Sequence, residues 1–535
     1  ETVAPSLIRA MAGEAIAGQS ANGGSVESKH PSSRKIPMKT IGDWGSFVLL
    51  VNNMMSHGLV VMPLAYQHTG WLGMIIMIGL CSYMSSFGIS FLAEAMSIIP
   101  GNERFQGRVT FMRICETYLS KRSAAIALAL FLTWIVVSNT SAIVLTAQTA
   151  DQAMLSSGAA CALEYYPQFR FKCITQGAKE DSVFGNSWVL SLGFVLTSCI
   201  TIPFSLVDIR ENMMAQSVTF IGIFVIIVTW TSFFLSKDLE DSRVPVIGQS
   251  GRGVGFVLFN FAYVVYAPAW INEKRSTVDI ESILVWSTLL GAMVFMVPCL
   301  LGAVALDFSN GQDLLALLTL KSTPVWVQIC TYTYPLFETL SSIPIFSIIM
   351  RYNLVENKIC SFKWAIFWSV CLPWVIALPF YAGDMVNAIV SWTGILIAGP
   401  TNLIIPALIY LAVSRKRKEL LSSSRKAGRS PASSAPAPLL LDRKRQHYED
   451  DGDNNDFGDD EKRLLEDPQN SEDDDEYDSF APTARSSSSS ESYVALPVEW
   501  EVTRKLMAHG IIAVTASVMV YAATVEGIYG VKKEF

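Results

Sequence analysis

The sequence predicts an all-α integral membrane protein with eleven membrane-spanning helices, and three observations support this fold class. The 535 residues are 51% hydrophobic and 16% charged, with a mean hydropathy of +0.36, whereas a soluble protein carries about 25% charged residues. Long uncharged runs alternate with short charged connectors. Each run can cross the hydrocarbon core as a helix, which satisfies its own backbone hydrogen bonds. The runs cover residues 44–66, 72–98, 123–150, 186–206, 213–236, 254–270, 281–306, 325–350, 362–381, 385–413 and 504–530.

The segment before the first run differs sharply from the rest. Residues 1–40 are rich in Ala, Gly and Ser and contain no apolar signal-peptide segment, so we expect a disordered cytoplasmic tail. The chain begins with Glu1, which we interpret as a start that has been trimmed or lost. Lys and Arg are more frequent in the connectors on the same side of the membrane as this tail, which predicts a cytoplasmic amino terminus. The helices from residue 41 to residue 413 then form one membrane core.

The first run carries polar residues at the depth of the membrane. It includes Asn52, Ser56 and His57, followed by Gly58 and then by Pro63. Gly and Pro both disfavour helix, and polar groups facing lipid cost several kcal/mol. We expect the helix to unwind around Ser56 to Gly58, where freed backbone groups line a cavity and bind a carboxylate or a cation.

The third run and the connector after it hold the next informative residues. Asn139 and Thr140 are polar positions within the third run. Cys161 and Cys173 lie in the 151–185 connector, which is predicted to face the oxidising side of the membrane, so a disulfide between them is expected. Two free thiols are the alternative.

The sixth run is interrupted like the first. It is aromatic, carries Asn260 and Tyr263, and contains Pro268. It opens the second set of five runs, as the first run opens the first set. Paired interruptions at corresponding positions of two halves are typical of a secondary transporter built as an inverted repeat, with its site between the broken helices.

Residues 414–503 form a long polar insert before the eleventh run, 504–530. The insert begins with basic residues and continues with acidic and serine-rich segments, a composition that does not bury a core. We expect a disordered cytoplasmic loop. It contains two short patterns that resemble sorting signals read by clathrin adaptors, one acidic dileucine and one tyrosine-based. Their defining residues are Asp460, Leu464 and Leu465, and Tyr493 and Leu496.

The broken first run carries a resemblance to a known family. NNMMSHGLVVMPLA, from Asn52 to Ala65, resembles the first span of the amino acid/auxin permease family, which includes sodium-coupled and proton-coupled amino acid transporters. In the eighth run, Ser341 and Ser342 come shortly before Pro344, and Arg351 follows, which is also similar to the family pattern. The resemblance covers about residues 40–413 and the last run.

This resemblance implies a five-plus-five inverted repeat of the LeuT-like fold, shared with the amino acid–polyamine–organocation superfamily, plus an eleventh helix. It implies secondary active transport of amino acids by alternating access, driven by sodium or protons. The implied ion ligands are Asn52 and Ser342, with Ser341 as the alternate, because hydroxyl and amide oxygens suit a hard cation. The family has Gly-Ser/Thr-Gly where this chain has Ser56-His57-Gly58. Because histidine titrates near neutral pH, His57 is expected to carry a coupling proton or to fill space in the pocket, and a neutral imidazole held by a structural hydrogen bond is the alternative.

The same resemblance places the substrate between the first, third and sixth spans. The carboxylate is expected on the N–H groups around Ser56 to Gly58, and the ammonium on backbone carbonyls of the sixth span. The substrate side chain would face a pocket lined by the sixth span and by the third. The residues assigned to the substrate are Ser56, His57, Gly58, Phe261, Ala262, Tyr263, Asn139 and Thr140.

Other functions are less compatible with the sequence. It contains no HExxH, Walker or GxGxxG motif and no Cys/His cluster with metal-ligand spacing, so we expect neither an enzyme nor a cofactor, and no nucleic-acid partner. An amino-acid sensor that signals through the 414–503 insert is the alternative function. The expected location is an endosomal, lysosomal or vacuolar membrane or the plasma membrane. The substrate, the driving ion and the oligomeric state stay open.

Overall fold

A computed structural model provides the fold. It describes residues 39–55, 58–102, 105–175, 183–185, 187–248, 252–308, 314–320, 322–381, 385–426 and 501–534. All of these residues belong to one unit, Lys39–Phe535. Ser56, His57, nearly all of the 1–40 tail and the two sorting patterns lie outside the described residues.

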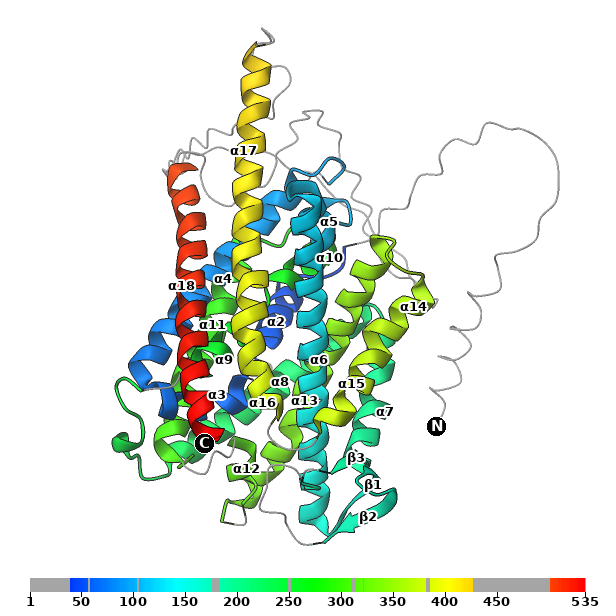
Figure 1. Ribbon diagram of the computed structural model, residues 1–535, viewed down its shortest axis with the longest axis vertical. Helices are drawn as coiled ribbons and strands as arrows, with labels where there is room; N and C mark the ends of the chain where they lie inside the picture. Colours follow the sequence, from blue (N-terminus) through cyan, green and yellow to red (C-terminus); the bar gives the residue numbers. More distant parts are fainter. Residues whose placement is uncertain are drawn as a thin grey trace, which may run out of the picture. The chain divides into compact units, whose positions relative to one another are not determined.

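Helices make up most of the described chain (Figure 1). The α-helices are α2 (Asp43–Met54), α3 (Gly58–Thr69), α4 (Trp71–Ser97), α5 (Phe111–Tyr118), α6 (Lys121–Ser157), α7 (Leu192–Leu206), α8 (Ile209–Leu235), α9 (Arg252–Asn260), α10 (Ala267–Glu273), α11 (Ile280–Ala305), α12 (Leu314–Leu318), α13 (Val325–Glu356), α14 (Phe362–Ile366), α15 (Leu372–Phe380), α16 (Met385–Thr393), α17 (Ile405–Lys426) and α18 (Glu501–Glu534). Short 3₁₀ helices are η2 (Asp241–Arg243) and η3 (Val264–Tyr266), and π-helical turns are η4 (Phe367–Cys371), η5 (Gly394–Ala398) and η6 (Pro400–Ile404).

The described residues include eight helices that are long and apolar enough to cross a membrane, and the bent pair of α2 and α3 is a ninth if its two helices form one span. The chain is therefore a multi-pass membrane protein. The two other predicted spans correspond to α7, which has 15 residues, and to α13, which has 32 residues but includes two prolines, two glutamates and an arginine. The count of eleven spans stays a prediction, because these two helices are too short or too polar to be identified as spans by length and hydropathy.

The helix surfaces are organised for lipid. On α8, the exposed apolar side chains recur at helical spacing, whereas the polar residues of the same helix are buried. The exposed residues are Met214, Val218, Ile221, Val225 and Val228, and the buried polar residues are Asn212, Gln216 and Thr219. An apolar outer face and a polar inner face are expected where the surrounding solvent is hydrocarbon and polar groups need protein partners.

A small antiparallel sheet, which the sequence analysis did not predict, occupies the connector after α6. Its strands are β1 (Ala160–Tyr166), β2 (Arg170–Ile174) and β3 (Trp188–Ser191), in the order β2-β1-β3. Cys161 and Cys173 are directly paired across β1 and β2 and form a disulfide. The sheet lies at one end of the long helix α6 and packs against α7 and α15 (Figure 1).

Basic residues gather at the other end of α6. The segment before α2 is fastened to the end of α10, since the N–H groups of Thr40 and Ile41 both donate to the Glu273 carbonyl at 3.1 Å. Lys39 donates to the Phe105 carbonyl, and Arg108 forms an ion pair with the Glu273 carboxylate at 3.0 Å. These contacts join the beginning of the first broken span, before α2, to the end of the second broken span, at the end of α10.

A buried ion cluster attaches the last helix to the core. Glu94 of α4 accepts from Arg417 of α17 at 3.3 Å through one carboxylate oxygen and from Arg504 of α18 at 3.2 Å through the other. Glu94 and Arg504 are 2% and 1% exposed, whereas Arg417 is partly exposed. The expected boundaries of the insert were wrong, because α17 continues to Lys426 and α18 begins at Glu501. One carboxylate therefore holds the two helices that flank residues 427–500.

Candidate functional site

The first broken span has its interruption where the sequence places it. α2 ends at Met54 and α3 begins at Gly58, and the two helix axes are bent by 47°. Pro63 lies inside α3, one turn after its start, where the missing donor removes one helical hydrogen bond at most. Gly58 is buried, and Ser56 and His57 are outside the described residues.

The second interruption lies several residues before Pro268. The helix α9 ends at Asn260, the turn Phe261–Tyr263 follows, and α10 resumes after the short η3. Pro268 stands in the first turn of α10, where its missing N–H is unneeded. Neighbouring helices fix the turn, because Ser85 of α4 donates to the Phe261 carbonyl at 2.9 Å and Tyr263 shares a hydrogen bond with Thr288 of α11 at 2.9 Å. Ala262 is buried between them.

The two interruptions meet at Gly58 and Asn260. A Cβ atom on Gly58 would lie 2.3–2.5 Å from three side-chain atoms of Asn260, so only glycine fits here. The Asn260 amide N–H donates to the Phe256 carbonyl at 2.7 Å, while its carbonyl oxygen has no partner among the described residues. The structure thus brings Gly58 next to the end of α9, as a site between two broken helices requires.

Asn52 and Ser341, two proposed ion ligands, are linked through a residue that the sequence analysis missed. The Asn52 amide donates to the Gln216 side chain at 2.9 Å and to the Thr219 hydroxyl at 3.3 Å, both on α8. Gln216 in turn donates to the Ser341 carbonyl at 2.7 Å. The helical spacing of Asn212, Gln216 and Thr219 opposite an apolar face was the sequence signal for this buried polar face.

The eighth run holds a second missed residue, Glu338. Ser341 and Ser342 each donate to the Glu338 backbone carbonyl, at 2.7 and 2.9 Å, and Ser342 also approaches the Glu338 carboxylate at 3.3 Å. Both hydroxyls are therefore bonded back to their own helix, the alternative to ion binding for serine within a helix. Glu338 is completely buried. One acid in an otherwise uncharged span was the signal that could have identified it.

The third-run residues face α13. Asn139 donates weakly to the Ser347 hydroxyl at 3.4 Å, and the Thr140 hydroxyl has no partner among the described residues. Nearby on α6, Trp134 donates to the Tyr266 hydroxyl of η3 at 2.7 Å, which connects this helix to the second broken span.

Several buried amide oxygens of the described residues lack a hydrogen-bond partner, and most of them lie on the helices of the candidate site. Within the described residues, the side-chain carbonyl oxygens that accept no hydrogen bond are those of Asn52, Asn53, Asn139, Asn212 and Asn260. Leaving a buried acceptor unpaired costs about 1–3 kcal/mol. Such oxygens are suited to an ammonium group or a hard cation, both of which are electron-poor donors or Lewis acids.

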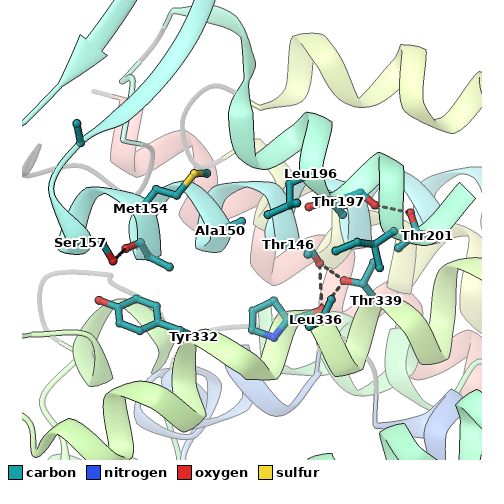
Figure 2. Close-up of a pocket in the computed structure, with 14 residues that line it drawn as sticks. Thr146, Ala150, Met154, Ser157, Leu196, Thr197, Thr201, Tyr332, Leu336 and Thr339 are labelled. Atoms are coloured by element: carbon teal, nitrogen blue, oxygen red, sulfur yellow. Dashed lines mark hydrogen bonds between the residues drawn. The ribbon is translucent and has the colours of Figure 1, made fainter. Parts of the chain in front are cut away.

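A separate cavity of about 500 Å³ opens between α6, α7 and α13 (Figure 2). A hydrogen bond between Thr146 and Thr339 crosses its wall, and apolar side chains such as Leu196 and Leu336 surround it. The lining residues are Thr146, Ala150, Ala153, Met154, Ser157, Ala159, Leu196, Thr197, Ile200, Thr201, Tyr332, Pro335, Leu336 and Thr339. The lining includes no residue of either broken span, so this cavity is distinct from the candidate site.

Residues 39–167 match the family model of transmembrane amino acid transporter proteins. This confirms the family resemblance over the first broken span, α4, α5 and α6. No curated protein sequence matches the chain.

A solved structure with a similar fold is Mhp1, a nucleobase-cation-symport-1 family transporter in a closed conformation with bromovinylhydantoin bound. The similarity covers 73% of this chain and 82% of that chain, with 14% sequence identity and a TM-score of 0.50. At this identity the likeness concerns the fold alone. The family match and the fold together point to membrane transport by a transporter rather than to an enzyme.

Proposed function

We propose that this protein is a secondary active transporter that moves amino acids across a membrane by alternating access. The observation that carries the proposal is the meeting of the two broken spans at Gly58 and Asn260. The family match over residues 39–167 supports amino acids as the substrate class. The same match and the transporter fold favour transport over the sensor alternative.

The substrate carboxylate docks on the backbone N–H groups that precede α3, where the helix dipole favours a negative group. These N–H groups belong to the stretch from Ser56 to Gly58. The ammonium meets acceptors at the end of α9, which include the Asn260 amide oxygen and the backbone carbonyls of Phe261 to Tyr263. The buried α6 residues Asn139 and Thr140 line the substrate side chain.

Two couplings to an ion gradient are compatible with these residues. Sodium would bind the Asn52 amide oxygen, backbone carbonyls at the end of α2 and the hydroxyl of Ser342 or Ser341. A proton would instead be carried by a titratable group of the site, and His57 is the candidate that the sequence offers. Neither coupling needs an organic cofactor.

The membrane location and orientation belong to the same proposal. A cytoplasmic amino terminus is supported by the basic cluster of Lys39, Arg108 and Lys274, which lies at the opposite end of α6 from the disulfide-linked sheet. The sorting patterns at Asp460–Leu465 and Tyr493–Leu496 would recruit clathrin adaptors and direct the protein to endosomal, lysosomal or vacuolar membranes, with passage through the plasma membrane.

The test is uptake of a mixed set of labelled amino acids into proteoliposomes, with an imposed sodium gradient or an imposed proton gradient. Native protein and His57→Ala are compared. Saturable uptake that follows one of the gradients supports the proposal. If uptake is driven by the proton gradient and is lost in His57→Ala, the coupling is assigned to His57. Binding of amino acids without uptake under either gradient would contradict transport.

A further inference from the structure

The cavity between α6, α7 and α13 is accessible from the lipid bilayer. Leu196 of α7 and Leu336 of α13 belong to its lining and are exposed. Each continues a stripe of exposed apolar side chains on its helix, with Leu192 one turn earlier on α7 and Ile329 two turns earlier on α13. Both helices pack against α6, which is one of the identified spans, so these stripes lie at membrane depth and face hydrocarbon.

The cavity follows α6 from the end of that helix into the membrane. Its lining on α6 extends from Ser157, the last residue of the helix, back to Thr146, which corresponds to a rise of about 16 Å. Figure 2 shows Ser157 and Tyr332 at one end of the cavity, and Thr146 and Thr339 at the other. Thr146 lies within the apolar run 123–150, whereas Ser157 follows this run and leads into the sheet. The cavity therefore extends from the level of the lipid head groups into the hydrocarbon.

The hydroxyl groups at the inner end already have hydrogen-bond partners in the wall. Thr146 and Thr339 share a hydrogen bond, and Thr339 donates to the Pro335 carbonyl. On α7, Thr197 and Thr201 donate to carbonyls one turn earlier in their own helix, at 2.8 and 2.9 Å. Threonine hydroxyls that are bonded in this way are satisfied within the protein. The inner end therefore needs no polar ligand.

Three kinds of molecule are small enough for a cavity of about 500 Å³, namely water, a free amino acid and a lipid chain. None of the described lining residues is charged, so the ammonium and carboxylate of an amino acid would lose their hydration without gaining an ion pair. Ordered water needs two to four polar partners, which the satisfied threonines do not supply. Hydrocarbon reaches the cavity directly from the bilayer, and it restores the dispersion contacts that an empty space would forfeit.

We propose that this cavity binds one acyl chain of a membrane phospholipid, taken from the leaflet on the side of the disulfide-linked sheet. The end of the chain reaches the Thr146–Thr339 pair. The ester region lies near Ser157 and Tyr332, where the phenolic hydroxyl donates to an ester carbonyl. The chain contacts α6, α7 and α13 together and stabilises their packing without touching either broken span. This structural lipid site is independent of the substrate that the protein carries.

The first experiment is photolabelling in phosphatidylcholine vesicles. A small fraction of the phosphatidylcholine carries a photoactivatable diazirine near the end of one acyl chain, and the labelled residues are identified by mass spectrometry of peptides. In native protein we expect labels on the cavity lining of α6 and α13. We also expect them on the exposed apolar face of α8, from Met214 to Val228, which contacts bulk lipid and serves as the internal standard.

Ala150→Phe is the decisive variant, because its ring fills the cavity from α6. We expect it to lose the labels on the lining and to keep those on α8. Ala150→Ser is the matched control and should keep both sets. Labels on α8 but not on the lining of native protein would overturn the inference, and so would lining labels that persist in Ala150→Phe. If Ala150→Phe does not fold, the native labelling pattern still decides, because it needs no substitution.

Two further measurements identify the occupant. A photoactivatable sterol is used in place of the phospholipid probe, and a lining labelled by the sterol alone would overturn the assignment to an acyl chain. Thermal unfolding in detergent is then followed as phosphatidylcholine is added. Native protein and Ala150→Ser should show a saturable rise in Tm that is smaller in Ala150→Phe. Equal rises in all three proteins would contradict a lipid site in this cavity.

Discussion

The Asn260 side chain fills the space beside Gly58 that a larger residue would need, at the point where two interrupted membrane helices meet. The hydrogen of Gly58 faces the Asn260 amide so closely that a methyl group in its place would be 2.3 Å from the Asn260 Cγ atom. The contact explains why a glycine follows the first interruption, because any other residue would push α3 away from α9. Because the two residues are in contact, the effects of substituting each of them on stability can be measured separately and together.

The first prediction uses this pair. Gly58→Ala should destabilise the protein by about 1–3 kcal/mol, the usual cost of an extra methylene in a filled interior. Asn260→Ala creates room, so the double variant should recover much of that loss. Thermal unfolding of the four proteins gives the coupling energy, which is expected to be clearly non-zero for residues in contact. Additive effects would show that the two side chains do not share this space.

The second prediction separates the candidate site from the cavity in Figure 2. Ala150→Phe places a ring in the cavity between α6, α7 and α13, and we expect the KM and maximal rate of uptake to stay near native values. The reason is that neither broken span lines this cavity. Ala150→Ser serves as the control, since it adds a single oxygen. A selective rise in KM for Ala150→Phe would move the substrate into the cavity.

The third prediction concerns the pH dependence of stability that Lys39, in the segment before α2, should cause. Burial and the nearby Lys274 charge lower the pKa of Lys39 from 10.5 to about 8, although Glu273 opposes this shift. Between these two values the unfolded chain binds the proton more readily than the folded protein, so stability should rise with pH across this window and stay constant with respect to Lys39 below it.

Thermal unfolding of native protein and Lys39→Gln across that window measures the effect. The variant should lack the part of the rise that Lys39 causes, whereas Lys121→Gln, at an exposed position at the start of α6, should keep it. Identical pH dependence in the native protein and Lys39→Gln would contradict the assignment.

The fourth prediction tests the buried cluster at Glu94. Glu94→Gln leaves the Arg504 guanidinium without its carboxylate in a site where Arg504 is 1% exposed. Removing one member of a buried ion pair typically costs about 3–5 kcal/mol, because an uncompensated charge stays behind. Arg417→Gln should cost much less. The Arg417 side chain is 33% exposed in the native protein, and Glu94 keeps its ion pair with Arg504 in this variant. Equal losses of thermal stability in the two variants would contradict a special role for the buried pair.

Local patterns were sufficient to predict the broken spans. Asn52, Gly58 and Pro63 are polar or helix-disfavouring residues inside an apolar run, and the helix is interrupted just before Gly58. The 161–173 cysteine pairing was likewise readable, because both residues lie in one connector on one predicted side of the membrane. In the sixth span the composition indicated the interruption but not its position, since a proline is equally compatible with the first turn of a new helix as with a break.

The hydrogen-bonded series from Asn52 to Glu338 was out of reach of such patterns. Its members are on α2, α8 and α13, and only the tertiary packing brings Gln216 between Asn52 and Ser341. The sheet β2-β1-β3 was missed for a similar reason, because its strands are short and pair across a connector that has no strong alternation of apolar residues.

The ion pairs of Glu94 with both Arg417 and Arg504 have a consequence for the segment between α17 and α18. The chain leaves the core after one of these helices and returns in the other, and both are pinned by the same carboxylate. The contacts to Glu94 therefore fix the positions of α17 and α18 whatever sequence connects the two helices. Doubling the length of a flexible closed segment costs only about 0.6 kcal/mol. A change in the length of the sequence between these helices should therefore carry little thermodynamic penalty for the membrane core.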